Sequence, residues 1–331
     1  MIDNLQSYRK QQMVSVLMIT HNHEKYIEEA IKGILMQQVV FPVELLICND
    51  ASTDNTNKII ESSIHNNKSQ VIITHTDHKQ NIGMMSNFIF GLKNCKSKYI
   101  ALCDGDDYWT DPLKLQKQVD FLEGNNDFSI CCTNAYHVKK ETDFKVIKTN
   151  TLFAREKPCH TIEQVDLLYQ NCILTATVVL RNSNSVFPEW MKKVALGDWC
   201  LFILYSFCGK IMYLSDVTAV YRFHEGGIFS MLGIKKQLIP YINTGELIRE
   251  NIPEASFKMR AGQQFRVNQL LDIYKKEEEF SLFLKYYLKY QYLLTSVNKK
   301  QQLYSISKII IRHVILKSKN VVRTGLAKLK I

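Results

Sequence analysis

The chain has 331 residues, of which 46% are hydrophobic and 22% are charged, and its formal net charge at pH 7 is +10. These values are typical of a folded globular protein, and they exclude an intrinsically disordered, collagen-like or low-complexity chain. No apolar run reaches the roughly 18 residues that cross a bilayer, and residues 1–12 lack the apolar core of a signal peptide, so we expect neither a membrane span nor secretion.

Short apolar runs alternate with helical patterns over residues 14–122. Four runs predict strands, because they are apolar and rich in residues that favour buried strands: 14–19, 43–48, 71–74 and 99–103. Apolar residues at helical spacing predict four helices after these strands: 27–35, 55–64, 84–93 and 112–122. This alternation predicts a mainly parallel sheet with helices on both faces, and such sheets bind ligands at the carboxyl ends of their strands.

Polar residues gather where three of these strands end. They are Thr20, His21 and Asn22 after the first strand, residues 49–54 after the second, and Asp104, Asp106 and Asp107 after the fourth. Three carboxylates within four residues repel one another, so a cation is needed to neutralise them. Oxygen ligands of this kind select Mg²⁺ or Mn²⁺ rather than zinc. The alternatives are a solvated turn at 104–107 and, for Asp54, a helix N-cap.

The segments VSVLMITHN, LLICNDASTDNT and NIGMMSNFIFGLKNCKSKYIALCDGDDYWTDPLKLQKQ occur in an order that resembles the family 2 glycosyltransferases. The shared elements are a first strand, a second strand that ends in Asp, an Asn-x-Gly segment, and an Asp-x-Asp followed by a proline and a helix. The resemblance covers residues 14–230. It implies the GT-A fold, an α/β, Rossmann-like mixed sheet that binds a nucleotide and is flanked by helices. It also implies a nucleotide-sugar donor, by family habit a UDP-sugar, with Mn²⁺ or Mg²⁺ as the cofactor.

The resemblance also implies which residues bind the donor. Asp50 matches the acid that bonds to the base, and Thr20 and His21 match the end of the first strand, which lies against the base. The nucleotide-sugar candidates are Thr20, His21, Glu24, Asp50, Asn81, Gly83, Asp104 and Arg222. His21 stands where the family commonly has Tyr, so stacking on the base is less certain than in other members.

The metal ligands implied by the resemblance are Asp106, Asp107 and His224. Asp106 matches the second Asp of the Asp-x-Asp, which holds the metal on the diphosphate, and Asp107 either supports it or replaces it. His224 belongs to a Tyr-Arg-x-His stretch at 221–224 that is similar in many members, where Arg222 would neutralise phosphate charge. A surface histidine with no ligand role is the alternative for His224.

The stretch Gly197-Asp198-Trp199 resembles the site of the family's general base. Apolar residues at helical spacing predict a helix that begins just after Asp198, which places this carboxylate at a helix N-terminus. Asp198 is therefore our candidate for the catalytic base, and a helix N-cap is its alternative or additional role. One base opposite the leaving group, with no enzyme nucleophile, implies a single displacement with inversion.

Three further features have structural interpretations. A strand is predicted at 216–223, with Asp216 at its start. Trp109, beside the acidic cluster, is either a platform for an acceptor sugar or a wall of the core. The nine cysteines show neither Cys-x-x-Cys pairs nor zinc-type spacing, so we expect free thiols.

Positive charge is concentrated in the last part of the chain. Residues 251–331 carry a net charge of +11, whereas residues 1–250 carry −1. We therefore predict a catalytic domain at 1–232, with a nucleotide-sugar half at 14–110 and an acceptor half at 111–232, and a basic helical region at 233–331. Segments 280–294 and 306–315 favour either an extension packed on the catalytic domain or peripheral binding to an anionic membrane. Nucleic acid is not an expected partner, because Arg is scarce and no recognition motif is present.

The predicted function is that of an inverting, metal-dependent glycosyltransferase acting on a hydroxyl of a glycan or lipid-linked acceptor. The resemblance implies cell-surface polysaccharide biosynthesis in a bacterium, in the cytoplasm or on the cytoplasmic face of the inner membrane. The main alternative is a catalytically silent nucleotide-sugar or glycan-binding module of the same fold, against which the presence of Asp104, Asp106 and Asp198 argues. A nucleotidyltransferase is a further alternative, which the absence of glycine from residues 20–26 disfavours.

Overall fold

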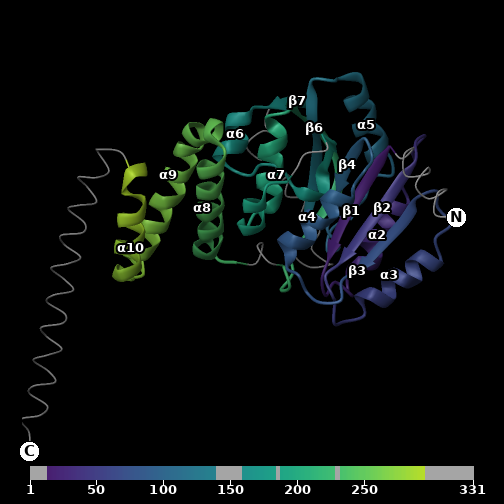
Figure 1. The fold of residues 1–331 in the computed structure, drawn as a ribbon, viewed down its shortest axis with the longest axis horizontal. Coiled ribbons are helices and arrows are strands. Elements are labelled where there is room, and N and C mark those ends of the chain that lie inside the picture. Colours follow the sequence, from purple (N-terminus) through teal and green to yellow (C-terminus); the bar gives the residue numbers. More distant parts are fainter. Residues whose placement is uncertain (1–12, 139–158, 184–186, 228–231, 295–331) are drawn as a thin grey trace, which may run out of the picture.

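The structure, a computed structural model, describes residues 13–138, 159–183, 187–227 and 232–294 (Figure 1). These residues form one nine-stranded mixed sheet in the order β3-β2-β1-β4-β8-β6-β9-β5, with β7 paired to β9. The strands are β1 Val14–Thr20, β2 Val43–Asn49, β3 Ile72–Asp77, β4 Tyr99–Leu102, β5 Tyr108–Trp109, β6 Phe128–Val138, β7 Cys159–Ile162, β8 Val178–Arg181 and β9 Lys210–Arg222. Strands β1 to β4 run parallel, whereas β8 is antiparallel to both β4 and β6.

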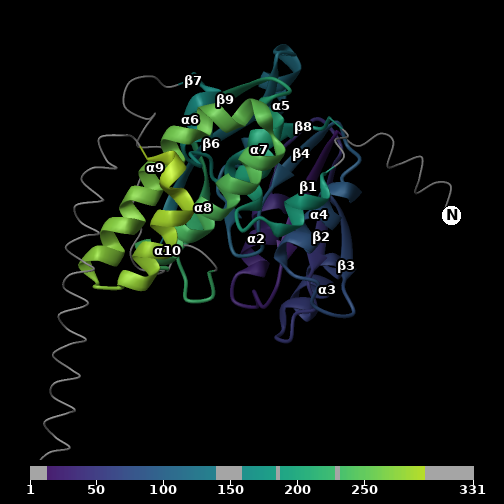
Figure 2. The same cartoon turned by 60° about the vertical axis from the view of Figure 1, so that its left-hand side comes forward.

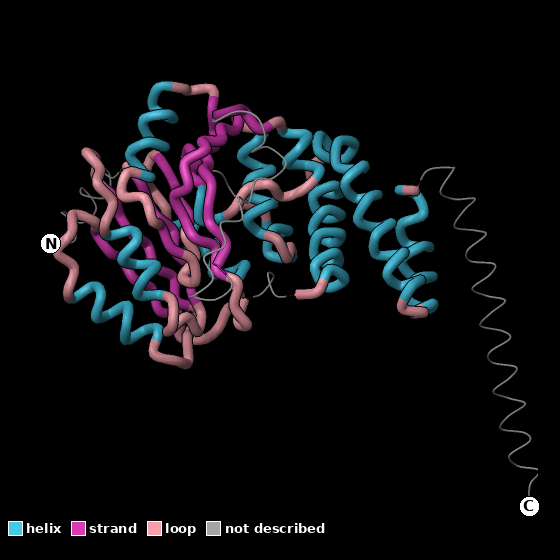
Figure 3. The backbone as a smooth tube through the Cα atoms, turned by 180° about the vertical axis from the view of Figure 1, so that it is seen from behind, coloured by secondary structure: helices cyan, strands magenta, loops and turns pink. Residues whose placement is uncertain are grey.

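Helices cover both faces of the sheet, as Figure 3 shows from behind. They are α2 Ile27–Leu35, α3 Thr56–His65, α4 Met84–Asn94, α5 Lys114–Gly124, α6 Gln164–Tyr169, α7 Gly197–Ser206, α8 Ile234–Asn251, α9 Pro253–Lys276 and α10 Phe280–Tyr290. The short 3-10 helices are η1 Thr175–Thr177, η2 Glu189–Lys193 and η3 Gln291–Leu293. All four strands and all four helices predicted within 14–122 are present, with ends that differ by at most three residues.

The alternation of side chains along the buried strands explains the layers. On β1, Leu17 belongs to a core that includes α4 and α7, while Val16 and Met18 belong to a second core that includes α2 and α5. Successive strand residues point to opposite faces, so a strand that is apolar throughout must be covered on both. The sheet is therefore a rigid central layer, and its carboxyl-end loops are held in place from both sides.

One structural prediction needs correction, and one pair of alternatives is decided. The predicted strand at 216–223 begins six residues earlier, at Lys210, because 210–214 also pair with β6 and β7 and bury Ile211 and Tyr213. Trp109 is not a sugar platform, since only 1% of it is exposed and its Nε1 donates a hydrogen bond of 2.8 Å to the Ala176 carbonyl. It is a wall of the core.

Helices α8, α9 and α10 extend the molecule beyond α7, with α8 next to α7 in both views (Figures 1 and 2). They share a core of their own, in which Leu270 and Tyr274 of α9 join Phe283 and Tyr287 of α10. Ile248 joins the core of α4 and α7 instead, so these helices are tied to the sheet. The predicted helical segment 306–315 lies outside the described residues.

Two predicted properties of the chain can be compared with the structure. No helix within the described ranges combines the length and the apolarity that crossing a membrane requires. All nine cysteines are free, and seven of them are buried. A buried free thiol packs as a small apolar side chain, which agrees with its prediction as part of the core.

Candidate functional site

The carboxyl ends of β1, β2 and β4 meet at one edge of the sheet. Thr20 is paired with Asn49, the Asp50 N–H donates to the Thr20 carbonyl at 2.9 Å, and the Gly105 N–H donates to the Ile19 carbonyl at 3.0 Å. Gly105 is required there, because a Cβ would lie 2.7 Å from Thr20 Oγ1. The polar clusters that follow these strands are therefore neighbours, as the sequence predicted.

Asp50 fixes the loop that leads into α4. Its Oδ1 accepts the Ile82 N–H at 2.7 Å and its Oδ2 accepts the Gly83 N–H at 3.0 Å, while the side chain is buried. Asn81 Oδ1 also accepts the Gly83 N–H, at 2.9 Å. Gly83 has φ +86°, a backbone conformation that glycine adopts without a steric cost. His21 lies alongside, with Nδ1 2.8 Å from the Asp50 carbonyl oxygen.

Glu24 and Asp54 join the loops after β1 and β2. Glu24 Oε2 accepts hydrogen bonds from the backbone N–H and the side-chain amide of Asn55, at 3.0 and 2.9 Å. Asp54 accepts the Glu24 N–H at 3.0 Å and the Thr56 N–H at 2.9 Å, at the start of α3. The predicted N-cap role of Asp54 is wrong by one residue: Asn55 is the N-cap of α3, and Asp54, just before it, bonds to the N–H of Thr56.

The three aspartates of the 104–107 cluster have different surroundings. Asp104 faces a cavity, and burial, together with the charges of Asp106 and Asp198, raises its pKa well above the ordinary value. Asp107 is buried, its Oδ1 accepts the Arg222 N–H at 3.0 Å, and burial raises its pKa as well. Their mutual repulsion was predicted from the sequence, but the difference between them was not.

Asp106 faces two histidines. His224 Nε2 donates to Asp106 Oδ2 at 3.1 Å, and His23 Nε2 lies 3.8 Å from the same oxygen. Burial by itself would raise the pKa of Asp106, but the hydrogen bond from His224 and the charges of the two imidazoles lower it below the ordinary value. Asp106 is therefore the member of the cluster whose ionised form its neighbours stabilise.

Arg222 braces the cluster from β9. Its guanidinium donates to the Asp106 carbonyl at 2.7 Å, forms an ion pair with Glu29, and lies 4.2 Å from the centre of the Tyr108 ring. Two of its five guanidinium N–H groups are engaged in these bonds, and its backbone N–H bonds to Asp107. Arg222 thus holds the shape of the 104–107 loop, whatever it does for a ligand.

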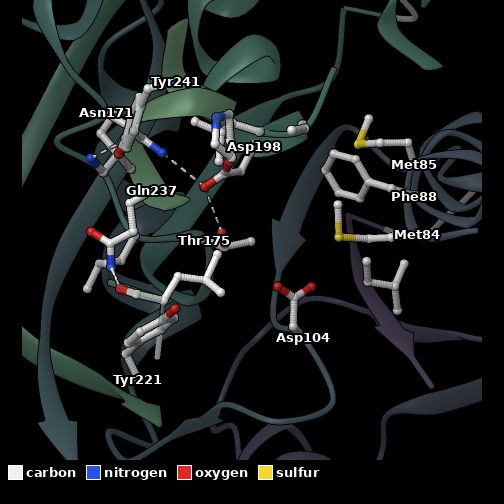
Figure 4. Close-up of a pocket in the computed structure, with 18 of the residues that line it drawn as sticks. Met84, Met85, Phe88, Asp104, Asn171, Thr175, Asp198, Tyr221, Gln237 and Tyr241 are labelled. Carbon is white, nitrogen blue, oxygen red and sulfur yellow. Dashed lines mark hydrogen bonds between the residues drawn. The ribbon is translucent and has the colours of Figure 1, made fainter. Parts of the chain in front are cut away.

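Asp198 and Asp104 line the same cavity, which has a volume of about 650 Å³ (Figure 4). Asp198 lies in the first turn of α7, where its Oδ1 accepts the Trp199 N–H at 2.7 Å. Its Oδ2 accepts hydrogen bonds from Asn171 Nδ2 at 3.0 Å and from Thr175 Oγ1 at 3.2 Å. Burial raises the pKa of Asp198 above its ordinary value, although all three bonds favour the charged form.

The walls of this cavity come from distant parts of the chain. Met84, Met85 and Phe88 of α4 form one side, and Gln237 and Tyr241 of α8 lie on the other side, near Asp198 (Figure 4). A second cavity of about 900 Å³ is lined by residues 21–26, Asp54 and 222–226. Phe223 lines both cavities, so they lie next to each other.

The sequence analysis missed three residues of this site: His23, Asn171 and Thr175. His23 stands two residues after His21 in the polar cluster that follows β1, so its position beside the acidic cluster was open to prediction. Asn171 and Thr175 follow α6 in a segment with no motif. Their contact with Asp198 depends on packing between α6, η1 and α7, which no local pattern records.

The donor set around Asp106 fits a divalent cation in its chemistry. A carboxylate and imidazoles are ligands for Mn²⁺ and related ions. Within the described part of the chain, however, no three His, Cys, Asp or Glu side chains stand together as a complete metal site. Ligands from outside the protein, such as the oxygens of a diphosphate, would have to complete it.

Comparison with known sequences identifies the family of the chain. The sequence model of Glycosyl transferase family 2 matches residues 15–186, and the chain therefore belongs to this family. An uncharacterized protein of Mycobacterium tuberculosis is 36% identical over 218 residues, which are 65% of this chain and 60% of that protein. The putative glycosyltransferase EpsE of Bacillus subtilis is 33% identical over 120 residues, 36% of this chain and 42% of that protein. The chain thus spans about 60% of the length of the mycobacterial relative.

Solved structures show the same fold. Residues 1–349 of TarS from S. aureus, in complex with UDP-GlcNAc, match 86% of this chain and 82% of that chain with a TM-score of 0.62 and 18% identity. The mannosyltransferase PcManGT from Pyrobaculum calidifontis, in complex with GDP-Man and Mn²⁺, matches 92% of this chain and 86% of that chain with a TM-score of 0.56 and 15% identity. The predicted GT-A fold, with its C-terminal helices, is confirmed.

Proposed function

We propose that the protein is an inverting, metal-dependent glycosyltransferase. It would move a sugar from a nucleoside diphosphate donor, a UDP-sugar, to a hydroxyl of a glycan or lipid-linked acceptor. The observation that carries the proposal is the cavity that Asp104 and Asp198 share. One carboxylate comes from the strand-end cluster expected to bind the donor, and the other comes from the opposite wall. Family membership and the nucleotide-sugar complexes of the structural neighbours support this function.

The donor would lie along the strand ends, with its nucleotide beside the 21–26 loop and its sugar toward Asp104. The second cavity offers the room for this, since His21, Glu24 and Arg222 line it. Thr20 Oγ1 is buried, has no hydrogen-bond partner among the described residues and lines neither cavity, so Thr20 would support the end of β1 rather than contact the donor. Asp50, Asn81 and Gly83 would shape the base pocket, mainly through the backbone that Asp50 holds.

Asp106 and His224 would hold the divalent cation, Mn²⁺ or Mg²⁺. The ion, when bound, supplies positive charge that stabilises the diphosphate as a leaving group. The geometry favours Asp106 over Asp107 for this role, because Asp107 is buried and bonded to the Arg222 backbone. Arg222 would add positive charge beside the diphosphate. Its ion pair with Glu29 would offset part of that charge, and its bond to the Asp106 carbonyl would limit its movement.

Asp198 would act as the general base. An acceptor hydroxyl in the shared cavity would give its proton to a carboxylate oxygen of Asp198 as its own oxygen attacks the anomeric carbon. The raised pKa of Asp198 makes it a better proton acceptor than an ordinary aspartate. Attack from the side opposite the leaving group, with no covalent enzyme intermediate, inverts the configuration of the sugar.

The acceptor would enter from the side of α8. Gln237 and Tyr241 line the cavity near Asp198, so the C-terminal region, which begins with α8, would help to select the acceptor. We further propose that this region binds an anionic membrane, on the cytoplasmic face, where a lipid-linked acceptor is made for bacterial surface polysaccharides. On α10, Leu284 and Leu288 are 40% and 54% exposed beside exposed Lys285 and Lys289, which suits an interfacial helix.

A panel of nucleotide sugars, assayed for nucleoside diphosphate release with Mn²⁺ or Mg²⁺, tests the transferase proposal. Wild-type protein should turn over at least one donor, whereas Asp198→Asn should bind UDP equally well and turn over about 10²–10⁴-fold more slowly. The exposed Asp120→Asn variant is the matched control and should behave as wild type. Full turnover by Asp198→Asn would remove this residue from the mechanism. A silent binding module would bind the nucleotide in every variant and turn it over in none.

A further inference from the structure

Two imidazole rings converge on one carboxylate oxygen of Asp106. His224 Nε2 is 3.1 Å from Asp106 Oδ2, and His23 Nε2 is 3.8 Å from the same atom. The two rings come from opposite ends of the catalytic region, one from the loop after β1 and the other from the segment after β9. A carboxylate oxygen can accept more than one hydrogen bond, but His23 Nε2 at 3.8 Å is too far away to donate one, so the ring faces Asp106 without being bonded to it.

We propose that His23 is a third protein ligand of the divalent cation, beside Asp106 and His224, and that the site therefore selects a transition metal such as Mn²⁺ over Mg²⁺. The inference rests on the proposed function, because the diphosphate of the donor supplies the remaining ligands. Because no three His, Cys, Asp or Glu side chains form a complete site within the described residues, His23 would have to move toward the ion when it binds.

The distances suit ligands of one octahedral ion. With metal–ligand bonds of about 2.1 Å, adjacent ligand atoms are about 3.0 Å apart and opposite ones about 4.2 Å. The separation of 3.1 Å between Asp106 and His224 matches adjacent positions, and that of 3.8 Å between Asp106 and His23 lies between the two values. Moving His23 into an adjacent position requires a shift of less than about 1 Å.

His23 is held in place but its ring is uncommitted. The backbone N–H of His23 donates to Thr56 Oγ1 at 2.8 Å, which anchors the loop to α3. Within the described ranges, Nδ1 is buried without a hydrogen-bond partner, and the nearest charged group to Nε2 is the carboxylate of Asp106. The ring of His224, by contrast, also packs on Tyr26, with centroids 4.5 Å apart. His23 can therefore turn toward an ion without breaking a hydrogen bond, and its edge contact with the His224 ring is all that must adjust.

The imidazole ligands determine whether the site prefers Mn²⁺ or Mg²⁺. Mg²⁺ is bound through oxygen and keeps much of its water, whereas first-row transition metals accept imidazole readily. A site with one carboxylate and two imidazoles should hold Mn²⁺ more tightly than Mg²⁺ once UDP has supplied its phosphate oxygens. With His224 as the sole imidazole, the preference should be weaker.

Electron paramagnetic resonance of Mn²⁺ bound to the full chain with UDP tests the proposal. Nitrogen modulation of the electron spin echo counts the imidazoles on the ion, and we expect two in the wild-type protein. His23→Gln and His224→Gln should each leave one, and His23→Gln should weaken Mn²⁺ binding by about tenfold or more while changing Mg²⁺ binding much less. His65→Gln, at an exposed histidine on α3, is the matched control and should leave both readouts unchanged.

The outcomes separate this inference from the proposed function. One imidazole on Mn²⁺ in the wild-type protein, or unchanged nitrogen modulation in His23→Gln, overturns the role of His23. The count in the wild-type protein decides this even where a variant fails to fold. The proposed function stands in either case if nucleotide-sugar turnover depends on metal. Absence of any Mn²⁺ uptake in the presence of UDP overturns both.

Discussion

The strand-end loops and the helix side of the shared cavity use their carboxylates differently. On the strand-end side, Asp50, Glu24 and Asp54 accept hydrogen bonds from backbone N–H groups of neighbouring loops. On the helix side, Asp198 accepts two of its bonds from the side chains of Asn171 and Thr175 and still faces the cavity. A carboxylate that accepts backbone N–H groups stabilises the conformation of a loop. A carboxylate held by side chains can instead keep an oxygen facing a ligand.

The 104–107 cluster contains both kinds of carboxylate, Asp106 and Asp107. Replacing each by asparagine should give the largest difference in turnover between two variants. Asp106→Asn should lower metal-dependent turnover by at least about a hundredfold, because the charge stabilisation supplied by a metal is worth several kcal/mol. Asp107→Asn should lower it much less, because an amide oxygen can still accept the Arg222 N–H. Steady-state kinetics at saturating Mn²⁺ with a common donor measures both.

Equal losses in the two variants would contradict the distinction between Asp106 and Asp107. A larger loss in Asp107→Asn would exchange their roles. Thermal unfolding of both proteins serves as the control, since a variant that unfolds early loses turnover for a reason unrelated to the metal.

Replacing Asp50 and replacing Asp104 should change the free energy of unfolding in opposite directions. Asp50→Ala leaves the Ile82 N–H without its acceptor and the Gly83 N–H with Asn81 Oδ1 alone, which should lower the free energy of unfolding by about 1–3 kcal/mol. Asp104→Asn removes a buried charge that its neighbours repel, which should raise the free energy of unfolding by about 1 kcal/mol at neutral pH. Urea unfolding monitored by circular dichroism provides both values.

The pH dependence of the Asp104 effect follows from its raised pKa. The native carboxyl holds its proton to higher pH than the unfolded one, so the wild type loses stability as the pH rises above the ordinary aspartate value. The advantage of Asp104→Asn should therefore be present at neutral pH and vanish in acid. An advantage that grows in acid would contradict the direction of this shift.

The sequence predicted the layers and the strand-end clusters because both are recorded locally. Continuous apolar runs such as 14–19 indicate strands buried on both faces, and parallel strands bring their carboxyl ends to one edge. The strand at 216–223 was predicted too short because residues 210–214 gain their place in it from pairing with β6 and β7. Pairing with strands that are distant in the sequence produces no periodic pattern of apolar residues in the segment itself.

The roles of individual acids were less predictable than their positions. Asp50 bonds to backbone groups more than thirty residues away, and Asp107 bonds to the backbone of Arg222. Trp109 is adjacent to the acidic cluster in sequence but points into the core. The predicted strand ends placed these residues at the correct edge of the sheet. Tertiary packing, however, decides which of their side chains face a ligand.

The smallest expected effect concerns Thr175, which tests whether the side-chain bonds on the helix side tune Asp198. Its hydroxyl donates to Asp198 Oδ2 at 3.2 Å and lowers the pKa of Asp198, while burial raises that pKa by more. Thr175→Val removes the donor but keeps the shape, so the pKa of Asp198 should rise further. A base must be deprotonated to act, so the acid limb of kcat/KM should move to higher pH with little change in the plateau. Thr175→Ser keeps the hydroxyl and should retain the wild-type profile. If Thr175→Val and Thr175→Ser share one acid limb, the hydroxyl does not influence the protonation of the base, which burial and the bonds from Asn171 and the Trp199 N–H then set.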